Sequence, residues 1–416
     1  MKADRNEIAR LAESCAKCGA CTSVCPVYQV TGRESLTARG RLHLLSRLAS
    51  PRSAAYGSIF SACLLCGACS DACPRNIDTL SLIIQARDEI PAYAQCHYAE
   101  KLLARKTLAS PLLLEKISRL GKNLAGLLPS TSGLRHKLFL LGDDAFPERG
   151  EPFPTPARCD SSPPTVSYFS GCLARYLNPD IHAATGFLTQ KFAGSSLLAP
   201  EEQHCCGLAS FSSGKIEEAR ELARKNIAAF ADHSLPILTS CASCYSHLRS
   251  YPKLLEDDNH WAGKAADFAG RLEEFSSFFL KYTERLPEKK PAGPTGSRSA
   301  IFYHDPCHLR FGPDKILTQP RELIRQLTGT KPMEAAAGPH CCGQGGLFHL
   351  AHPDLSQKIL SGAMANFMKL SAKQIVTTCS GCLLQLRQGT GSSGQDKEVL
   401  HLAVLLARVA ARREKG

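Results

Sequence analysis

Short apolar runs alternate with longer stretches of helical periodicity from about residue 166 onward. Four of these runs are rich in β-formers and end just before a cysteine: TVSYF precedes Cys172, PILT precedes Cys241, SAIFY precedes Cys307 and QIVT precedes Cys379. Strands that alternate with helices predict two α/β units built on parallel sheets. The cysteines are therefore expected just beyond the carboxyl ends of the strands, at the edge where such sheets place ligands.

This part of the chain is an internal repeat with the same cysteine spacing in both halves. Each half reads one cysteine, about 32 to 33 residues, Cys-Cys-Gly, about 34 to 36 residues, and C-x-x-C. Five cysteines are one more than a structural zinc site needs. Neighbouring cysteines do not easily form a disulfide with each other, but both thiols can approach one metal centre. The candidate ligands are Cys172, Cys205, Cys206, Cys241 and Cys244 in the first half and Cys307, Cys341, Cys342, Cys379 and Cys382 in the second.

Glycines and histidines accompany these cysteines. Gly207 and Gly343 follow the two Cys-Cys pairs and give the backbone freedom for a tight turn. Two interpretations are open for the adjacent histidines: a hydrogen bond to a ligand or a proton relay, or a hydrogen bond that only holds the local turn. These histidines are His204, His340, His304 and His308.

The segment before residue 166 has a helical pattern. Between residues 32 and 48, four leucines fall on one helical face and four arginines lie elsewhere. The helix either simply covers its neighbours, or its arginines offset negative charge or meet a partner. Residues 91 to 143 are basic and rich in leucine, which indicates a helical connector or a surface for a partner or membrane. Residues 144 to 165 carry six prolines and are expected to be a linker.

The N-terminal region contains the most specific motif of the chain, a cysteine run that occurs twice. Each run has the spacing C-x-x-C-x-x-C-x-x-x-C and is followed by proline. This is the ligand pattern of proteins with two 4Fe–4S cubanes, in which the fourth cysteine of each run binds the other cluster. Structural zinc also uses C-x-x-C pairs, but the doubled run favours iron–sulfur clusters. The predicted ligand sets are Cys15, Cys18, Cys21 and Cys73 for one cluster, and Cys25, Cys63, Cys66 and Cys69 for the other.

Composition narrows the compartment and the partners. The chain has 20 cysteines, of which only Cys96 and Cys159 fall outside the motifs, and no apolar segment that resembles a signal peptide or a membrane span. Cysteine-rich runs without an export signal favour metal binding in a reducing cytoplasm, with peripheral docking on the inner face of the membrane left open. The net charge of +12 is consistent with a solvated surface, or with a docking face for an acidic protein or anionic lipid. No motif accompanies it that would indicate nucleic-acid binding.

These patterns predict a multidomain chain of the α+β and α/β classes. An α-helical two-cluster ferredoxin-like domain is expected over residues 1–90, followed by the connector and linker over 91–165. Two repeated α/β cysteine-rich units are expected over 166–285 and 300–416.

On these motifs the chain resembles the iron–sulfur subunit of glycolate oxidase, with relatives in D-lactate and glycerol-3-phosphate dehydrogenases. The resemblance covers CAKCGACTSVCPVYQVTGRESLTARGRLHLL, CLLCGACSDACP and the two Cys-Cys-Gly units. It implies a hetero-oligomer in which a partner FAD-linked subunit oxidises a 2-hydroxy acid, glycolate or D-lactate. This chain would then pass the electrons to quinone or another acceptor. No G-x-G-x-x-G follows a strand, so a nucleotide cofactor and substrate oxidation are expected in the partner alone.

The C-terminal units also resemble those of heterodisulfide reductase subunits, where the five-cysteine motif binds a non-cubane 4Fe–4S cluster. Both C-x-x-C pairs are intact here, which implies one or two further clusters and an alternative function in disulfide reduction. A third hypothesis is a metal-bound scaffold without a redox role.

Overall fold

The computed structural model describes residues 5–47, 54–89, 98–110, 164–231, 234–283, 300–336, 338, 340–393 and 397–412. The chain forms two compact units that are interleaved along the sequence. The first unit comprises Met1–Lys106, Gly207–Glu221 and His340–Ala363, and the second comprises Thr107–Cys206, Leu222–Pro339 and Met364–Gly416. Cys96, Cys159, nearly all of the predicted proline-rich linker and most of the predicted connector lie outside the described residues.

The first unit is helical, and most of its N-terminal helices are short. Pro26 and Gly32 set the bounds of one of them, because Pro26 occupies its first turn and Gly32 ends it in the left-handed conformation. Its helices are α1 (Arg5–Glu13), α2 (Ala20–Ser23), α3 (Pro26–Thr31), the 3₁₀ helix η1 (Glu34–Leu36), α4 (Ala38–Arg47), α5 (Ala54–Ser61), α6 (Ala68–Asp71), α7 (Thr79–Glu89), most of α8 (Tyr98–Ala109), α13 (Leu208–Ser212), the start of α14 (Ile216–Ala229), α21 (Phe348–Ala351) and most of α22 (Pro353–Met368).

Two apolar clusters stabilise this unit, and each includes cysteines from the N-terminal runs. One cluster joins Ile8, Leu42 and Leu82 and packs against Cys15 and Cys73. The other includes Val27, Leu36, Ala62, Leu64, Phe348 and Ile359 and packs against Cys25, Cys66 and Cys341. Burying an aliphatic side chain of this size contributes about 1.5 to 3 kcal/mol, so these contacts bring segments far apart in sequence into one core.

The seven strands found among the described residues all lie in the second unit and form two parallel sheets. The first sheet has the order β2-β1-β3-β4, and the second has the order β5-β6-β7. A parallel bridge between Phe302 and Met333 extends the second sheet at the position that β2 takes in the first. The strands are β1 (Val166–Phe169), β2 (Leu197–Leu198), β3 (Ile237–Thr239), β4 (Leu272–Glu274), β5 (Ile301–Tyr303), β6 (Gln374–Thr377) and β7 (Glu398–His401).

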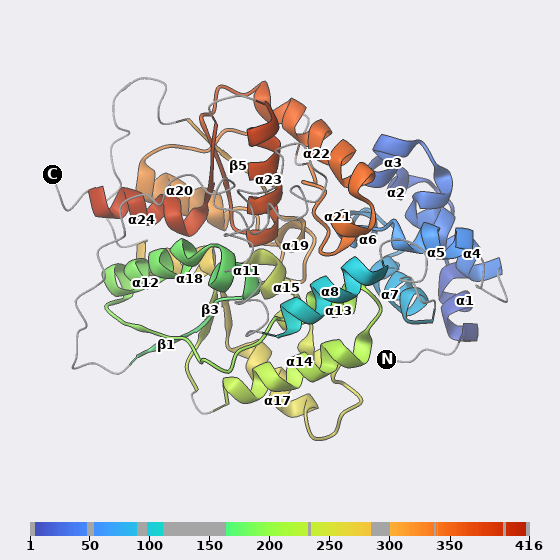
Figure 1. Ribbon diagram of the computed structural model, residues 1–416, viewed down its shortest axis with the longest axis horizontal. Helices are drawn as coiled ribbons and strands as arrows, with labels where there is room; N and C mark the ends of the chain where they lie inside the picture. Colours follow the sequence, from blue (N-terminus) through green and yellow to red (C-terminus); the bar gives the residue numbers. More distant parts are fainter. Residues whose placement is uncertain are drawn as a thin grey trace. The chain divides into compact units, whose positions relative to one another are not determined.

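Helices connect the parallel strands and pack the two repeats together (Figure 1). Helix α12 of the first repeat packs on α24 of the second, and α18 packs on α20. The shared interface explains why both repeats belong to one compact unit. The helices are α11 (Cys172–Leu177), α12 (Pro179–Ala193), most of α14, α15 (Ala242–Arg249), α16 (Tyr251–Leu254), α17 (Ala262–Gly270), α18 (Phe275–Thr283), α19 (Cys307–Arg310), α20 (Gln319–Thr328), α23 (Ser380–Ser393) and α24 (Leu402–Arg412).

The predicted fold class is confirmed: a helical N-terminal region precedes two α/β repeats with parallel sheets. Strands β1, β3, β5 and β6 are almost completely buried, as expected when helices cover both faces of a parallel sheet. Cys172 and Cys307 begin the helices that follow β1 and β5, while Cys241 and Cys379 directly precede those that follow β3 and β6. Among the described residues, no helix is long and apolar enough to cross a membrane.

Candidate metal centres

The two N-terminal cysteine runs share one backbone conformation. Lys17 and Leu65, the residues before the second cysteine of each run, are left-handed with φ of 57° and 54°. Gly19 and Gly67, the residues after it, have φ of 86° and 87°. A left-handed non-glycine residue costs on the order of 1 kcal/mol or more, so the surrounding loop must hold it in place. The sequence repeat is therefore a repeat of structure, with both loops folded in the same way.

The first cavity of these loops is lined by cysteines from both runs. Cys15, Cys18 and Cys21 of the first run line it together with Cys69 and Cys73 of the second. Lys17, Arg39 and Arg75 lie on the same lining, and Cys18 is exposed to solvent. This cavity thus opens to the surface at one cysteine and carries basic side chains at its rim.

The second cavity has the complementary lining. Cys25 of the first run lines it together with Cys63, Cys66 and Cys69 of the second. Cys73 of the second run thus lines the first cavity, and Cys25 of the first run lines the second. The predicted exchange of the fourth ligands between two clusters is compatible with this lining and stays a prediction. A set of thiolate donors around a small enclosed space suits a soft, cationic iron–sulfur centre.

Burial and mutual repulsion govern the charge state of the thiols in the second cavity. Desolvation, followed by repulsion from Cys341 and Cys69, raises the pKa of Cys66 well above its ordinary value. Desolvation and the neighbouring Cys63 raise the pKa of Cys69 to about 12. Such crowded, buried thiolates require positive charge at their centre, and a bound metal supplies it and deprotonates the thiols. The donor chemistry of the cavity therefore fits a metal cluster.

Two buried arginines hold the backbone that leads into the second cysteine run, a role that no pattern in the sequence indicated for either of them. Arg41 is 2% exposed and donates to the carbonyls of Ile59 and Ala62 at 3.0 and 2.6 Å. Its charge also lowers the pKa of Cys25 and Cys69, against the dominant effect of burial. Of the two interpretations of the arginines in this segment, Arg41 therefore supports the one in which they offset negative charge. Arg87 donates to the carbonyls of Phe60, Ser61, Cys63 and Ser212.

The second Cys-Cys-Gly turn (Cys341–Gly343) packs against the second cysteine run within the first unit. Cys341 and Cys66 pack against the same apolar cluster, and the negative charge of Cys341 helps burial to raise the pKa of Cys66. Gly343 has φ of 85°, which confirms the predicted tight turn, and Ser356 donates to its carbonyl at 2.9 Å. The contact places a cysteine of the second motif beside the predicted cubane ligands.

The five cysteines of the first motif gather at the carboxyl edge of the first sheet. The Sγ atoms of Cys172 and Cys205 are 3.8 Å apart. Hydrogen-bond contacts with Cys206 and then Cys241, together with burial, raise the pKa of Cys244 well above its ordinary value. Four of the five side chains are buried, and only Cys172 is partly exposed. This arrangement brings the whole motif together as a second type of thiolate site.

Asn226 and Tyr251 fix the first Cys-Cys-Gly turn, although no motif in the sequence marked them. Asn226 donates to the carbonyl of Cys205 at 3.0 Å, and its Oδ1 accepts from the backbone N–H of His204 at 2.8 Å. Tyr251 donates to the carbonyl of Cys206 at 2.7 Å. Both side chains are fully buried, so they hold the turn without access to solvent.

The two C-x-x-C segments meet in the second unit. The backbone N–H of Ala242 donates to the carbonyl of Thr378 at 2.9 Å. The hydroxyl of Ser243 lies 3.1 Å from the Sγ atom of Cys379 and 3.0 Å from Nδ1 of His308. Contacts with Cys241, Cys382 and Ser243 lower the pKa of Cys379 well below its ordinary value, against burial. The two motifs are therefore adjacent at their C-x-x-C segments.

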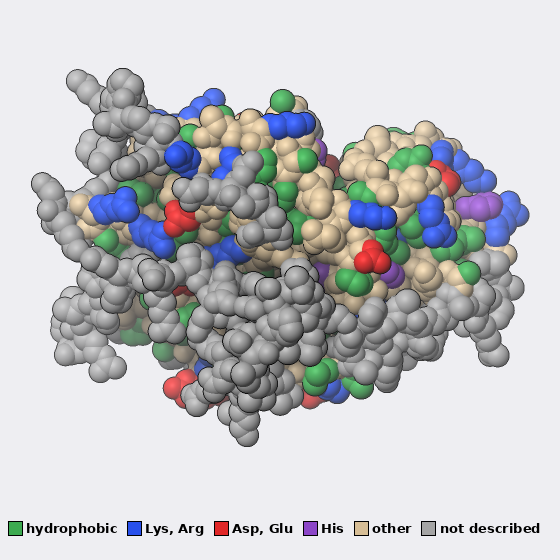
Figure 2. Space-filling model, turned by 45° about the horizontal axis from the view of Figure 1, so that its top comes forward, with side chains coloured by type: hydrophobic (Ala, Val, Ile, Leu, Met, Phe, Trp, Pro, Cys, Tyr) green, Lys and Arg blue, Asp and Glu red, His purple; other side chains and the backbone are tan. Residues whose placement is uncertain are grey.

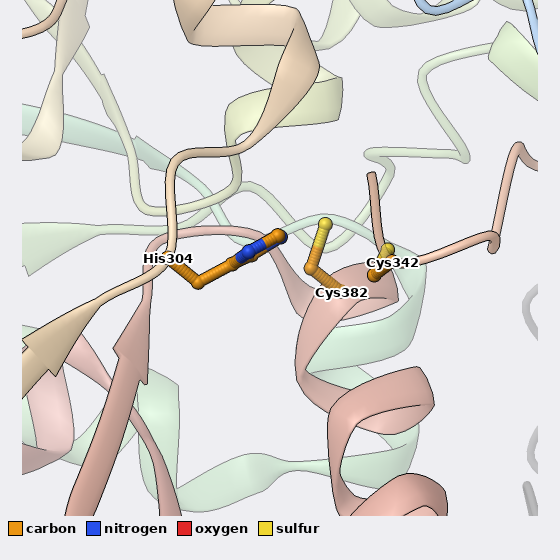
Figure 3. Close-up of side chains that lie close together, drawn as sticks. All are labelled: His304, Cys342 and Cys382. Carbon is orange, nitrogen blue, oxygen red and sulfur yellow. The ribbon is translucent and has the colours of Figure 1, made fainter. Parts of the chain in front are cut away.

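The second motif is divided between the two units. Cys307, Cys379 and Cys382 belong to the second unit, whereas Cys341 and Cys342 belong to the first. Within the second unit, the ring of His304 lies beside Cys382, with a ring nitrogen within 4.8 Å of the thiol sulfur (Figure 3). The predicted grouping of all five cysteines in this motif stays a prediction.

The histidines differ in what they contact. Nδ1 of His204 lies 2.6 Å from the carbonyl of Glu202, which supports the interpretation that it holds its local turn. His308 instead contacts Ser243 of the other repeat, and His304 lies beside a cysteine. For these two, a role next to the ligands is the better interpretation.

Basic side chains are distributed over the face of the molecule drawn in Figure 2. On the face drawn in Figure 2, Lys and Arg side chains of the described residues are spread among apolar and neutral ones instead of forming one field. This distribution is consistent with an ordinary solvated surface on that face.

Comparison with known proteins agrees with these geometries. Residues 11–77 match the 4Fe–4S dicluster domain, and residues 166–249 and 301–387 each match a cysteine-rich domain. The chain is 30% identical to the probable glycolate oxidase iron–sulfur subunit of Bacillus subtilis, over 96% of this chain and 94% of that protein. It is 28% identical to lactate utilization protein A of Shouchella clausii, over 58% of this chain and 98% of that protein.

The dicluster match spans the eight cysteines around the first and second cavities, and both cysteine-rich matches span the repeated motifs. The resemblance extends over nearly the whole chain, at an identity that establishes common family membership. The chain therefore belongs to the family of glycolate oxidase iron–sulfur subunits and acts in electron transfer through iron–sulfur centres.

Proposed function

We propose that the chain carries two 4Fe–4S cubanes and relays electrons from a partner FAD-linked subunit that oxidises glycolate or D-lactate. The observation that supports this proposal most is the lining of the two cavities. Cys73 of the second run lines the first cavity with Cys15, Cys18 and Cys21, and Cys25 of the first run lines the second cavity with cysteines of the second run. A cubane bound there supplies one-electron transfer. The acceptor is quinone or another carrier, and the complex works in the cytoplasm or peripherally at the inner face of the membrane.

The path of electrons through the chain follows from exposure and contact. Cys18 is the exposed member of its set, so the first cavity is the natural point of contact with the flavoprotein. Cys69 lines both cavities, which keeps the two centres within direct transfer distance. Cys341 packs beside Cys66, so the second cavity connects to the cysteine-rich part of the chain. The name of the relative from Bacillus subtilis supports a hetero-oligomer with an oxidase subunit.

We further propose that the first five-cysteine motif holds a third, non-cubane 4Fe–4S cluster. The support is the gathering of Cys172, Cys205, Cys206, Cys241 and Cys244 at one sheet edge. The second motif would hold a fourth cluster only if the first unit brings Cys341 and Cys342 to the remaining three cysteines. Iron analysis of anaerobically purified protein distinguishes these cases: about 8 iron atoms per chain indicate the cubanes alone, and about 12 or 16 indicate one or two further clusters.

The relay is tested by removing one ligand from each cavity. In the complex with its flavoprotein, Cys18→Ser and Cys66→Ser should each abolish acceptor reduction while substrate still reduces the flavin. Cys96→Ser, which lies outside both motifs, is the matched control and should leave acceptor reduction unchanged. Full acceptor reduction by either ligand variant would exclude the relay, and zinc in place of iron would exclude the whole assignment.

A second candidate is disulfide reduction at the cysteine-rich part of the chain. It is favoured by the two intact C-x-x-C segments, which meet through Ser243 and Cys379. Anaerobic assay with a heterodisulfide and reduced viologen discriminates the two functions. Turnover that is lost in Cys241→Ser and retained in Cys18→Ser would favour this candidate over the relay.

A further inference from the structure

The two cysteine runs of the first unit form loops with the same backbone conformation but different surroundings. In the second loop, Leu64 and Leu65 are only 5% and 7% exposed, and Leu64 belongs to the same apolar cluster as Phe348. Ala16 and Lys17 take the same two positions in the first loop, and both are exposed. Another segment of this chain thus covers the second loop, whereas the corresponding side of the first loop faces solvent.

The turns that follow the two runs differ in the same way. Val27 follows Pro26 of the first run and is 2% exposed. Arg75 follows Pro74 of the second run, and both of these residues are exposed. Since Pro74 and Arg75 line the first cavity, the exposed turn and the exposed side of the first loop border the same cavity. The surface that they form, here called the first-loop surface, comprises Ala16, Lys17, Cys18, Pro74 and Arg75.

The first-loop surface is basic. Of the described residues that line the first cavity, three are basic and none is acidic. One of the three, Arg39, forms an ion pair with Glu34 at 2.6 Å and donates to the carbonyl of Lys17 at 3.0 Å. Its charge is therefore offset, and its second contact holds the loop in place. The two exposed cations on this lining are Lys17 and Arg75, and carboxylates of another protein would complement them.

The number and place of these cations favour a protein partner over a lipid surface. Recognition of anionic lipid takes a cluster of about four to eight lysines and arginines. The first-loop surface instead has two, and they flank the exposed cysteine of a candidate redox centre. Charges at the rim of a protein interface speed association and fix the orientation of the partner. The partner that must approach this centre in one orientation is its electron donor.

We propose that the first-loop surface is the docking site for an acidic face of the FAD-linked subunit, with Lys17 and Arg75 facing carboxylates of that subunit. The small side chain of Ala16 lets the partner approach Cys18 closely. The proposal rests on the relay function and identifies the surface through which the electron donor binds. On the first loop, the donor takes the place that α21 and α22 of this chain take on the second.

Docking can be measured without turnover, as the dissociation constant between the full-length, anaerobically purified chain and its FAD-linked subunit. Lys17→Glu and Arg75→Glu should each raise this constant about 5- to 20-fold at low ionic strength, because each replaces an attraction with a repulsion. The difference should shrink as added salt screens the exposed charges. Lys358→Glu is the matched control and should bind like the wild type. It reverses the same charge at an exposed position of α22, the helix that packs against the second loop.

Cross-linking tests the same surface without any substitution. A carbodiimide joins a lysine ammonium to a carboxylate that lies in direct contact with it. In the complex of the two wild-type subunits, we expect a cross-link from Lys17 to an aspartate or glutamate of the FAD-linked subunit, identified by mass spectrometry. High salt during the reaction should suppress this cross-link.

The proposal is overturned if neither charge reversal weakens binding at wild-type iron content. Where a variant loses iron, the cross-link decides, and its absence at Lys17 overturns the proposal. If Lys17→Met shifts the midpoint potential of the first centre but binds the FAD-linked subunit normally, the cations serve the cluster alone and the proposal is wrong. It is also wrong if Lys17→Glu abolishes binding to phosphatidylglycerol vesicles and leaves binding to the FAD-linked subunit unchanged. Failure of the relay is seen separately, as wild-type subunits that dock but whose iron centres the substrate cannot reduce.

Discussion

Buried arginines shape the cysteine loops at the level of single residues. Arg41 and Arg87 each place a guanidinium in the core of the first unit and donate to carbonyls in the last turn of α5 and at the start of the second cysteine run, which the end of the helix leaves without intrahelical partners. A buried carbonyl without a donor costs about 1 to 3 kcal/mol, so one arginine that satisfies several of them stabilises an irregular loop. The same positive charge faces the thiols of the second cavity, so Arg41 contributes both to the fold and to the electrostatics of the site.

Replacing Arg41 with methionine should lower the free energy of unfolding by about 2 to 4 kcal/mol, because two buried carbonyls lose their charged donor. Arg41→Lys keeps the charge but has a single donor head, and should lose about half as much. Arg33→Met removes the same charge from an exposed position and should change stability by less than about 0.5 kcal/mol. Urea unfolding of the three variants under anaerobic conditions measures these differences. Equal stability of Arg41→Met and wild type would contradict the assigned role.

At the level of elements, the candidate metal-binding cysteines lie in loops and at the ends of strands. The second Cys-Cys-Gly turn comes close to the second cysteine run because residue 345 has no side chain. A Cβ atom on Gly345 would lie 2.5 Å from Cδ2 of Leu64 and 2.9 Å from Cβ of Phe348. Gly346 is also left-handed, but a Cβ there would meet its nearest neighbour, Oγ of Ser212, only at 3.5 Å. Substitutions at these two adjacent glycines therefore separate two effects: both would strain the backbone, but only a side chain at Gly345 would clash with a neighbour.

Gly345→Ala should destabilise the first unit by about 1 to 3 kcal/mol more than Gly346→Ala. Both substitutions place alanine at positive φ, so the strain cancels in the comparison and the difference reports the contact with Leu64. Thermal or urea unfolding of the two variants gives the result. Equal losses would show that the loop can move away from Leu64 without cost.

At the end of the last strand, His401 joins the two repeats. Its Nδ1 accepts from the N–H of Ala403 at 3.1 Å, so its Nε2–H donates to the carbonyl of Ser240 at 2.9 Å. Burial lowers the pKa of this histidine to about 4. Glu274 takes the corresponding place at the end of β4 and accepts from Ser276 and from the N–H of Ser277. Each repeat thus ends its last strand with a buried polar side chain.

The low pKa of His401 predicts acid sensitivity. Since the folded state holds the neutral ring, its contribution to stability is complete above pH 6.5 and is lost as the pH falls from 6.5 toward 4. At pH 5.5 the loss relative to pH 7.5 should be about 1.4 kcal/mol. His401→Gln does not titrate and should lose that much less over this interval, as urea midpoints at the two pH values would measure. The buried His247 is present in both proteins and cancels. Identical pH dependence of the two proteins would contradict this prediction.

The sequence predicted the elements with a strong local signal. The strands before Cys172, Cys241, Cys307 and Cys379 follow from apolar runs that end at cysteines. The ligand exchange of Cys25 and Cys73 stays a prediction from the spacing of the runs. The burial of Arg87 and its role in holding the backbone were not predicted, because a single arginine at the end of a helix gives the same local signal whether its side chain is solvated or buried. The sequence also did not predict that His340–Ala363 belongs to the first unit. This assignment depends on packing against Leu64, which no local pattern encodes.

At the scale of the whole molecule, the two units differ in what stabilises them. Among the described residues, the first unit has no sheet, and its helices α2 and α6, which lie between the cysteines, are too short to be stable alone. The second unit has parallel strands buried on both faces and helices that pack the two repeats together. The first unit should therefore depend far more on its metal, because metal binding and folding are coupled at such sites.

Removing the iron with a chelator under oxidising conditions should unfold the first unit and leave the sheets folded. Hydrogen exchange followed by mass spectrometry should then show loss of amide protection in residues 5–89, while β1, β3, β5 and β6 stay protected. The decisive segment is His340–Ala363, which belongs to the second repeat by sequence and to the first unit by packing. It should lose protection together with residues 5–89, because its apolar contacts include Leu64 and Leu36. Protection of this segment together with the strands would show that it folds with its own repeat, and that the first unit ends at the N-terminal helices.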